Sequence, residues 1–455
     1  MNLSRLMAAR AEAGNPVHVG LIGAGKFGSM FLAQARLTKG LHLLGIADLD
    51  VARARGNCRQ VGWSDEQIAA PSLDDALTSG ASHIGDDAMA LISHPGLDVL
   101  IDATGDPRIG IRHCLAAIEN GKHVIMVNVE ADVVAGPLLA RKAEAAGVVY
   151  SLAWGDQPAL ICEHVDWARS CGFEVTAAGK GTRYLPDYHS LTPDTVWAVL
   201  QQYLDIDDPE SINLQMFNSF LDGSKSAIEM TAVCNATGLI PQDAGLQFPS
   251  ASRFELADIC KPSSDGGVLT RSGTTEVVSS LTRAGETVAH HLAMGTFVVI
   301  QAGSDYARQC LREYHMLPDK TGQYGALYRP THMIGLELGV SIASVALRGE
   351  PTGQPMCFSS DVVAIAKRDL KIGELLDGEG GHCVFGRQMP SEKSLSARTV
   401  PLGLSAGMRL VRNVASGQML CRDDVDVGTP DEATLARDEM VSAFAPPKIP
   451  PATQQ

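Results

Sequence analysis

The chain has 455 residues, of which 45% are hydrophobic and 20% are charged. At roughly 100–200 residues per domain, about two to four domains are expected, each large enough for its own core. No apolar run approaches the ~18 residues that a membrane-spanning helix needs, so we expect no membrane partner.

The net charge is −15, from 37 basic and 52 acidic residues, without a basic cluster. Nucleic-acid-binding surfaces are basic, and we therefore expect no nucleic-acid partner. Residues 1–20 lack the apolar segment of a secretory signal, which predicts a cytoplasmic protein. The ten cysteines are scattered and include no C-x-x-C pair, so the sequence predicts neither a disulfide framework nor a zinc finger.

Residues 1–155 alternate short apolar runs with helical patterns. A short amphipathic helix is predicted within residues 1–15, and runs typical of buried strands follow it. These runs cover residues 17–22, 41–48, 98–104, 122–128 and 148–153. Apolar strands that alternate with helices are typical of α/β proteins with a doubly wound parallel sheet.

The rest of the chain loses this alternation. Residues 156–350 mix strand and helix patterns, so we expect an α+β catalytic domain there, and its segment 331–349 should be a helix that packs back toward the first unit. Beyond a Pro-containing linker, residues 351–430 have the Gly-rich turns of a small all-β module. Residues 431–455 end in a Pro-rich stretch, and we expect a flexible tail.

The strongest motif is GAGKFG at residues 23–28, which follows an apolar strand and opens a helical pattern. Its glycines have the G-x-G-x-x-G spacing: the first allows the tight turn, the second admits a pyrophosphate, and the third lets helix and strand pack closely. The N-terminus of the helix offers free N–H groups to phosphates. This context predicts a Rossmann dinucleotide-binding domain.

An acidic residue, Asp48, ends the next predicted strand, 20 positions after the last glycine of the motif. A carboxylate there accepts hydrogen bonds from a ribose 2′-OH and repels a 2′-phosphate, which favours NAD over NADP. Arg53 and Arg55 lie close enough in sequence to give the opposite preference, so NADP stays open. A later strand ends at residues 102–105, at the edge of the sheet where ligands bind. The predicted cofactor-binding residues are Gly23, Gly25, Lys26, Phe27, Gly28, Asp48, Thr104, Gly105 and Asn128.

The N-terminal half resembles homoserine dehydrogenases through GLIGAGKFG, DVLIDATG and AAIENGKHVIMVNVEADV. The whole chain is more similar to homoserine dehydrogenase-like oxidoreductases with a C-terminal SAF domain, a group that includes deoxyxylulose-phosphate reductoisomerase-like enzymes. That similarity is carried by NGKHVIMVNVEADVVAGP, SLAWGDQP, AAGKGT, FLDGSKSAIEM, NATGL, AIAKRDLKIGELLDG and VPLGL. The resemblance implies an NAD(P)-dependent oxidoreductase. Because the nucleotide loop lies far upstream, we expect residues 352–455 to be dispensable for cofactor binding.

Two segments depart from these families. Homoserine dehydrogenases usually carry Asn-Lys where this chain has Asn128 followed by valine, so the lysine expected near the nicotinamide is missing. The run after AAGKG also differs from that of the reductoisomerase-like enzymes, which indicates a different substrate pocket. In this run Arg183, Tyr188 and His189 are candidates for binding a carboxylate or phosphate of the substrate.

Hydride transfer at a carbinol needs a group that moves a proton on oxygen and a positive charge near the developing alkoxide. Lys180, between two glycines after a predicted strand, is the first candidate for either role, and Lys225 is the second. Glu229 follows Lys225 by four residues, so these two could pair on one helix face. Asp156, at the expected domain junction, could orient a catalytic lysine. We predict no metal site, because the Glu, His and Asp side chains within residues 163–166 lie on different faces of a helix.

Three functions stay open at this point. The first is a dehydrogenase or reductase for a small hydroxy or keto acid or a sugar-acid derivative, with homoserine dehydrogenase as one variant. The second is a reductoisomerase, which rearranges a sugar phosphate before reduction and would need a divalent metal. The third is a nucleotide-sensing or carbohydrate-binding protein, which needs no buried lysine at the nicotinamide. For an enzyme we expect a small anionic or polyhydroxylated substrate and a homo-oligomer.

Overall fold

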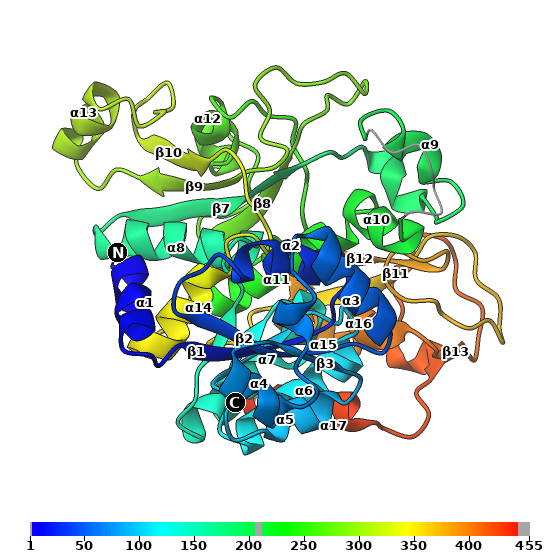
Figure 1. Cartoon of the computed structure of the whole chain (residues 1–455). Coiled ribbons are helices and arrows are strands. Elements are labelled where there is room, and N and C mark those ends of the chain that lie inside the picture. Colours follow the sequence, from blue (N-terminus) through cyan, green and yellow to red (C-terminus); the bar gives the residue numbers. More distant parts are fainter. Residues whose placement is uncertain (1, 205–211, 445–455) are drawn as a thin grey trace, which may run out of the picture.

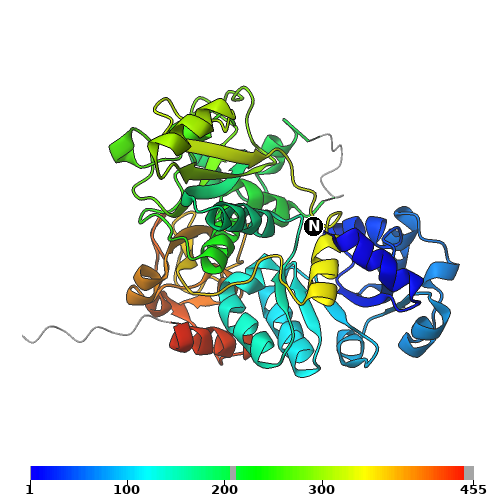
Figure 2. The same ribbon diagram turned by 90° about the vertical axis from the view of Figure 1, so that its left-hand side faces the viewer.

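The computed structural model describes residues 2–204 and 212–444. Residues 2–155 hold a six-stranded sheet and are called the first domain; residues 156–350 hold a four-stranded sheet and are called the second domain; residues 351–430 hold two small sheets and are called the C-terminal module, and a terminal helix follows. Figure 1 shows the sheet of the first domain below that of the second, and Figure 2 shows the C-terminal module beside both. Within the described residues, no helix is long and apolar enough to cross a membrane.

The first domain is built on a parallel sheet of six strands. The strands are β1 (Val17–Ile22), β2 (Leu41–Ala47), β3 (His83–Gly85), β4 (Val99–Asp102), β5 (His123–Met126) and β6 (Tyr150–Leu152). Their order in the sheet is β3-β2-β1-β4-β5-β6, and every neighbouring pair is parallel. This order reverses between β1 and β4, which is the doubly wound topology predicted from the sequence.

Helices cover both faces of this sheet. They are α1 (Leu3–Glu12), α2 (Lys26–Ala35), α3 (Val51–Gln60), α4 (Leu73–Ser79), α5 (Ala88–Ser93), α6 (Pro107–Glu119) and α7 (Val129–Ala145). One core joins α1, α2 and α3 to the sheet, and the core on the opposite face joins α5, α6 and α7 to it. The strands are buried on both sides, which explains why they appear as continuous apolar runs.

The second domain has a mixed sheet in the order β10-β9-β7-β8. Its strands are β7 (Glu174–Thr182), β8 (Thr274–Ser279), β9 (Thr296–Gln301) and β10 (Tyr324–Arg329), and its helices are α8 (Gln157–Ser170), α9 (Trp197–Leu200), α10 (Leu214–Leu221), α11 (Ser224–Thr237), α12 (Leu256–Ile259), α13 (Asp305–Glu313) and α14 (Gly339–Arg348). As expected, α14 packs back onto the first domain, where Leu338, Ile342 and Val345 join the core that holds α1 and α2.

The C-terminal module contains two small antiparallel sheets. Its elements are β11 (Ser360–Ala366), β12 (Val384–Pro390), α15 (Ser391–Ser396), α16 (Leu402–Ser405), β13 (Arg409–Leu410) and β14 (Val425–Asp426). The pairs β11·β12 and β13·β14 are antiparallel. Two short helices lie among the strands, so the module is less purely β than its glycine-rich turns suggested.

The expectation of a flexible tail from residue 431 is wrong for the helix α17 (Glu432–Phe444). Ala433, Ala436 and Met440 are buried in the core shared with α6 and α7. They lie three, then four residues apart, which places them on one helix face. Residues 445–455, which hold the Pro-rich stretch, lie outside the described residues.

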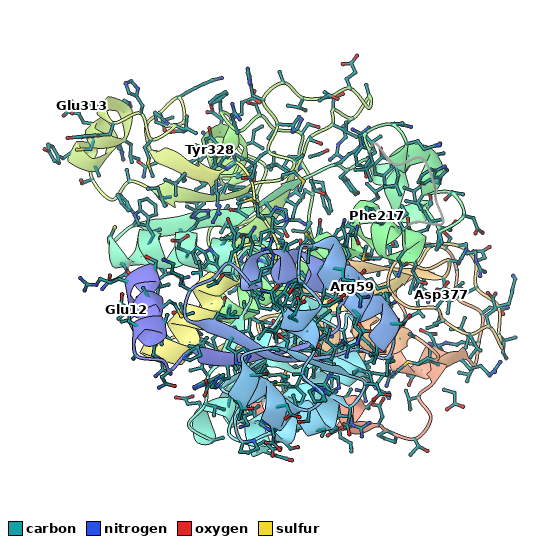
Figure 3. All side chains as sticks on the ribbon, viewed as in Figure 1. Glu12, Arg59, Phe217, Glu313, Tyr328 and Asp377 are labelled. Atoms are coloured by element: carbon teal, nitrogen blue, oxygen red, sulfur yellow. The ribbon has the colours of Figure 1, made fainter. Side chains whose placement is uncertain are left out.

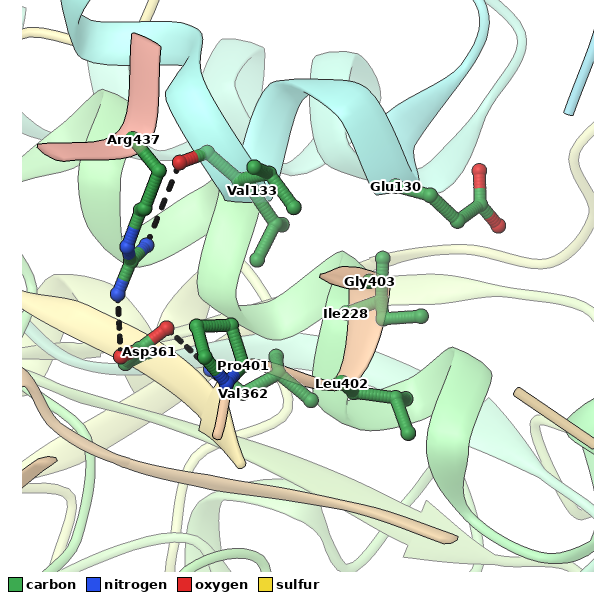
Figure 4. A pocket seen from close by; sticks show the side chains of 10 residues that line it. Glu130, Val133, Ile228, Asp361, Val362, Pro401, Leu402, Gly403 and Arg437 are labelled. Carbon is green, nitrogen blue, oxygen red and sulfur yellow. Dashed lines mark hydrogen bonds and ion pairs between the residues drawn. The ribbon is translucent and has the colours of Figure 1, made fainter. Parts of the chain in front are cut away.

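One buried ion pair fixes α17 to the C-terminal module. Arg437, only 2% exposed, pairs with Asp361 of β11 at 2.6 Å and donates to the carbonyl of Val134 in α7. Figure 4 shows both contacts beside a cavity of about 10 Å³, room for a single water at most. The core of the first domain also includes Phe358 and Leu404. Side chains of the C-terminal module and of α17 therefore pack into the core of the first domain, and the dispensability of residues 352–455 for cofactor binding stays a prediction.

We expect Arg437→Met to lower the free energy of unfolding by about 3–5 kcal/mol, because it leaves the Asp361 carboxylate buried without its cation. Denaturant unfolding followed by circular dichroism measures this loss. Arg422→Met is the matched control, since Arg422 pairs with Asp438 of the same helix at the surface, where a pair contributes about 0–1 kcal/mol. Equal losses in the two variants would contradict this role of the buried pair.

Candidate active site

The candidate site lies along the carboxyl ends of the parallel strands. The turn at residues 23–28 follows β1, Asp48 follows β2, Thr104 follows β4, and Asn128 follows β5. Asp156 comes four residues after the last residue of β6. In open α/β sheets this edge, at the point where the strand order reverses, is where ligands bind.

The three glycines of the turn have distinct roles. Gly23 has φ +92°, and a Cβ there would lie 2.7 Å from the carbonyl of Ala103. A Cβ on Gly28 would lie 2.4 Å from the Gly23 carbonyl, so this glycine lets α2 approach the turn. A Cβ on Gly25 would meet nothing within 4 Å. The open side of Gly25, directly before the N-terminus of α2, fits the pyrophosphate of a dinucleotide.

Asp48 is engaged within the protein more fully than the sequence suggests. Its Oδ2 accepts from the backbone N–H of Ala24 at 2.8 Å, and its Oδ1 accepts from that of Asp50 at 2.9 Å. Arg53 also donates to Oδ1 at 2.9 Å, while its own side chain stays 56% exposed. A guanidinium therefore stands beside the carboxylate that was expected to repel a 2′-phosphate. Arg55 faces elsewhere and donates to the carbonyl of Ile68.

This pairing predicts a moderate preference for NAD over NADP, set by Asp48 against Arg53. In Arg53→Leu the preference for NAD should widen about 10- to 100-fold, because a charge-assisted hydrogen bond to a 2′-phosphate is lost. Titration of tryptophan fluorescence with each nucleotide measures both affinities. Arg59→Leu, on the same helix but paired with Asp65, should leave the ratio unchanged. Tighter binding of NADP than NAD by the unaltered chain would contradict the assignment of Asp48.

Polar side chains after β4 and β5 form a connected network. Asn128 donates to the Thr104 hydroxyl at 3.2 Å and to the carbonyl of Asp106 at 2.8 Å. Thr104 donates to Asp102, whose other carboxylate oxygen lies 2.7 Å from His113 Nδ1. These bonds fix the two loops that carry the predicted cofactor-binding residues Thr104 and Asn128. Gly105 follows Thr104 in the first of these loops; it has φ +73° and open space beside it.

Lys180 lies at the centre of the second domain's site. It is 3% exposed, on β7, and its ammonium pairs with Glu229 of α11, which is 2% exposed. A Cβ on the flanking Gly179 or Gly181 would fall within 2 Å of the carbonyls of Glu276 and Leu292. The glycines around Lys180 therefore let the neighbouring protein backbone approach closely.

The predicted pair of Lys225 with Glu229 is wrong. Lys225, in the first turn of α11, pairs with Glu130 of the first domain. Burial alone would lower the pKa of Lys225, but the carboxylates of Glu130, Glu379 and Glu229 outweigh this and raise it. Two lysines of the second domain are thus each held by a carboxylate, one of them across the domain junction.

Asp156 lies near both lysines, whose charges act on its carboxyl. It is 3% exposed and caps the N-terminus of α8, where it accepts from the backbone N–H of Gln157. With its amide nitrogen turned to the carboxyls, Gln157 lies 3.0 Å from Asp156 Oδ1 and 3.1 Å from Glu229 Oε1. Burial and the neighbouring Glu229 raise the pKa of Asp156 to about 7. Asp156 is therefore a carboxyl able to exchange a proton near neutral pH.

The segment before α14 links this cluster to the nucleotide turn. His332 Nε2 lies 3.3 Å from the Gln157 amide oxygen, and three residues on, a Cβ at Gly335 would lie 3.0 Å from the carbonyl of Phe27. Three residues span at most about 11 Å. The cluster around Lys180 consequently lies within reach of the first turn of α2, which also carries Lys26.

The three candidate substrate-binding residues are engaged in contacts within the protein. His189 is engaged inside the protein on both ring nitrogens, by Tyr184 at 2.8 Å and by the carbonyl of Asp222 at 2.6 Å. Tyr188 belongs to an apolar cluster with Leu200 and Leu221. Arg183 stacks over the ring of Tyr203 at 4.7 Å. These contacts point to structural roles for His189 and Tyr188, contrary to the expectation from sequence.

Four residues of the cluster were not among the predicted site residues. Glu130 was noted only for its place near a strand end that faces the ligand crevice and in a segment that departs from the family pattern, and Gln157, His332 and Glu379 drew no attention. Gln157 had one available signal, since it follows Asp156 in the segment SLAWGDQP that carries the family resemblance. Among the described residues, no group of three or more His, Cys, Asp or Glu side chains has the arrangement of a metal site.

Comparison with known proteins agrees with this geometry. Residues 19–152 match the NAD-binding domain of homoserine dehydrogenase, and residues 155–338 match the catalytic domain of the oxidoreductase DRL. Residues 19–152 and 155–338 are thus NAD(P)-dependent oxidoreductase domains, and the predicted SAF domain stays a prediction.

Individual relatives are similar over short stretches only. Homoserine dehydrogenase of Methylobacillus glycogenes is 31% identical over 25% of this chain and 25% of its own length. The 1-deoxy-D-xylulose 5-phosphate reductoisomerase of Pseudomonas syringae pv. syringae is 29% identical over 29% of this chain and 37% of its own. An NAD-binding oxidoreductase structure from Klebsiella pneumoniae covers 37% of this chain and 43% of its own, at 20% identity and a TM-score of 0.28. The chain spans well under half the length of these relatives.

Proposed function

We propose that the chain transfers a hydride between the nicotinamide of NAD and the carbinol or carbonyl carbon of a small hydroxy or keto acid or a sugar-acid derivative. The observation that carries this proposal is the cluster of Lys180, Glu229 and Asp156, joined to the nucleotide turn through residues 332–335. A protein that only senses a nucleotide has no need of a buried lysine and a titrating carboxyl there.

The residues divide the chemistry between them. A bound nicotinamide supplies or accepts the hydride. Lys180, held by Glu229, places fixed positive charge where the substrate oxygen becomes an alkoxide. Asp156 carries the proton: it takes one from the hydroxyl during oxidation and returns one to the oxygen during reduction. Because the cluster also contains Glu130 and Glu379, it favours a substrate rich in hydroxyl groups over a strongly anionic one.

The test is a screen of hydroxy acids, sugar acids and sugar phosphates with NAD and with NADP, followed by the absorbance of the reduced nicotinamide. Each assay is run with a chelator and again with Mg²⁺ or Mn²⁺. Turnover of a hydroxy or sugar acid in the chelator supports the proposal. Turnover of a sugar phosphate only with metal would replace it with the reductoisomerase function, and nucleotide binding without turnover of any compound would refute it.

The pH dependence follows from the raised pKa of Asp156, near 7. Oxidation needs the carboxylate, so kcat/KM for oxidation should fall below about pH 7, whereas reduction needs the acid form and should fall above it. In Asp156→Asn both limbs should vanish and the rates should drop about 10²–10⁴-fold. Initial rates in both directions between pH 5 and 9 measure this. Asp156 would be excluded as the proton carrier if kcat/KM fell on the same side of pH 7 in both directions. The same conclusion would follow if Asp156→Asn kept the pH dependence.

A further inference from the structure

The loop between β11 and β12 brings the C-terminal module against the second domain. Gln215 of α10 donates to the carbonyl of Asp377 at 3.1 Å and to that of Glu379 at 2.9 Å. Figure 3 shows Asp377 on this module, next to α10 with its labelled Phe217. Glu379 thus belongs to a segment whose backbone is held directly by the second domain.

Buried polar contacts fix the same loop from the other side. Lys367, at the end of β11, donates to the carbonyls of Gly381 and Leu191 at 2.7 Å each and pairs with Asp222 at 2.8 Å. Asn218 donates to the carbonyl of Gly380 at 2.7 Å, and Gly380 has φ +66°. A Cβ there would lie 2.1 Å from the carbonyl of Gln215, so only glycine allows this approach. These contacts hold the loop in place, and they therefore also fix the backbone position of Glu379.

Glu379 lies on the Lys225 side of the cluster, because Gln215 and Asn218 hold residues 379 and 380 against α10, which leads directly into α11 and Lys225. It is near enough to Glu130, Lys225 and Asp222 for their charges to act on it, and it is partly accessible. Burial and the Glu130 carboxylate raise its pKa to about 8, so at neutral pH it keeps a proton that it can donate. The Lys225 side chain is 17% exposed and that of Lys180 only 4%. Lys225, on the side of the cluster where Glu379 lies, is thus the more accessible of the two lysines.

We propose that the C-terminal module completes the substrate site, and that Glu379 binds a hydroxyl group of the substrate beside Lys225. This inference rests on the proposed oxidoreductase function. Glu379 then determines specificity: it selects substrates that carry a hydroxyl beyond the reacting carbinol over short hydroxy acids that lack one. A site built to hydrogen-bond a hydroxyl discriminates strongly against an analogue without it, because its polar group is left unpaired.

The experiment compares kcat/KM of the full chain for two substrates of the screen, a polyhydroxylated sugar acid and a short hydroxy acid. In Glu379→Ala, kcat/KM for the sugar acid should fall about 10- to 100-fold, with a change of less than about threefold for the short acid. Glu379→Gln, which can still hydrogen-bond a hydroxyl, should recover much of the loss. Glu392→Ala, an exposed glutamate of α15 in the same module, is the matched control. NADH affinity should be unchanged in all three variants.

The outcomes separate the two proposals. If the unaltered chain is active and Glu379→Ala changes both substrates equally or neither, Glu379 does not bind the substrate, and the oxidoreductase function stands. A selective loss with recovery by glutamine supports the inference. If the unaltered chain turns over no compound of the screen, the proposed function itself fails, and the role of Glu379 fails with it.

Discussion

Lys180→Met should lower kcat by about 10²–10⁴-fold while leaving NADH affinity nearly unchanged. The variant keeps the length and apolar stem of the side chain and removes only the ammonium that faces Glu229. Loss of a charge that stabilises an alkoxide typically costs this much. NADH affinity should not change because the phosphate-binding turn belongs to the first domain, whereas Lys180 belongs to the second. Steady-state rates and nucleotide titration on the same preparation measure them.

Two further variants separate catalysis from folding. Lys180→Met leaves the Glu229 carboxylate buried without a cation, a destabilising change. Adding Glu229→Gln removes that charge and should restore stability without restoring the rate. Lys261→Met removes another buried lysine of the second domain, paired with Asp319 at 2.7 Å, and should destabilise the fold without slowing turnover. Turnover by Lys180→Met within a few-fold of the unaltered chain would make Lys180 a bystander and Lys225 the leading candidate.

The nucleotide half could be predicted from the sequence because its signals are local. The apolar run of β1, the three glycines and the helix after them occupy adjacent positions, and their physical roles depend on that adjacency. The terminal helix was missed for the opposite reason. Its apolar residues Ala433, Ala436 and Met440 do have helical spacing, but the Pro-rich stretch beyond them suggested a tail, and only contact with α6 and α7 stabilises the helix.

The ion-pair partners of Lys180 and Lys225 could not be predicted from local sequence. Lys225 and Glu229 have the i,i+4 spacing of a helix pair, which contributes only about 0.2–0.5 kcal/mol. In the folded chain Lys225 pairs with Glu130, 95 positions away, and Lys180 pairs with Glu229, 49 positions away. Buried charges must be paired, so these distant contacts override the local one. The candidate residues could be identified by type, but their partners depend on the packing of the first and second domains.

Gly25→Val should reduce the affinity for NAD and NADP about 100-fold or more without unfolding the protein. The φ of Gly25 is −71°, which valine adopts, and a Cβ there meets no protein atom within 4 Å. The added side chain would instead occupy the space before the N-terminus of α2, so the pyrophosphate could not reach the free N–H groups. Two or more charge-assisted hydrogen bonds, each worth about 1.5–3 kcal/mol, would be lost.

The size of the side chain provides the internal test of this assignment. Gly25→Ala should weaken nucleotide binding less than Gly25→Val, since a single methyl group fills less of the same space. Gly303→Val makes the identical replacement at another open glycine, in the second domain, and should leave nucleotide affinity unchanged. Thermal unfolding should show all three variants folded. The turn, the helix N-terminus and the open side of Gly25 together define the predicted phosphate site. Normal nucleotide affinity in a folded Gly25→Val variant would therefore contradict the assignment of that site.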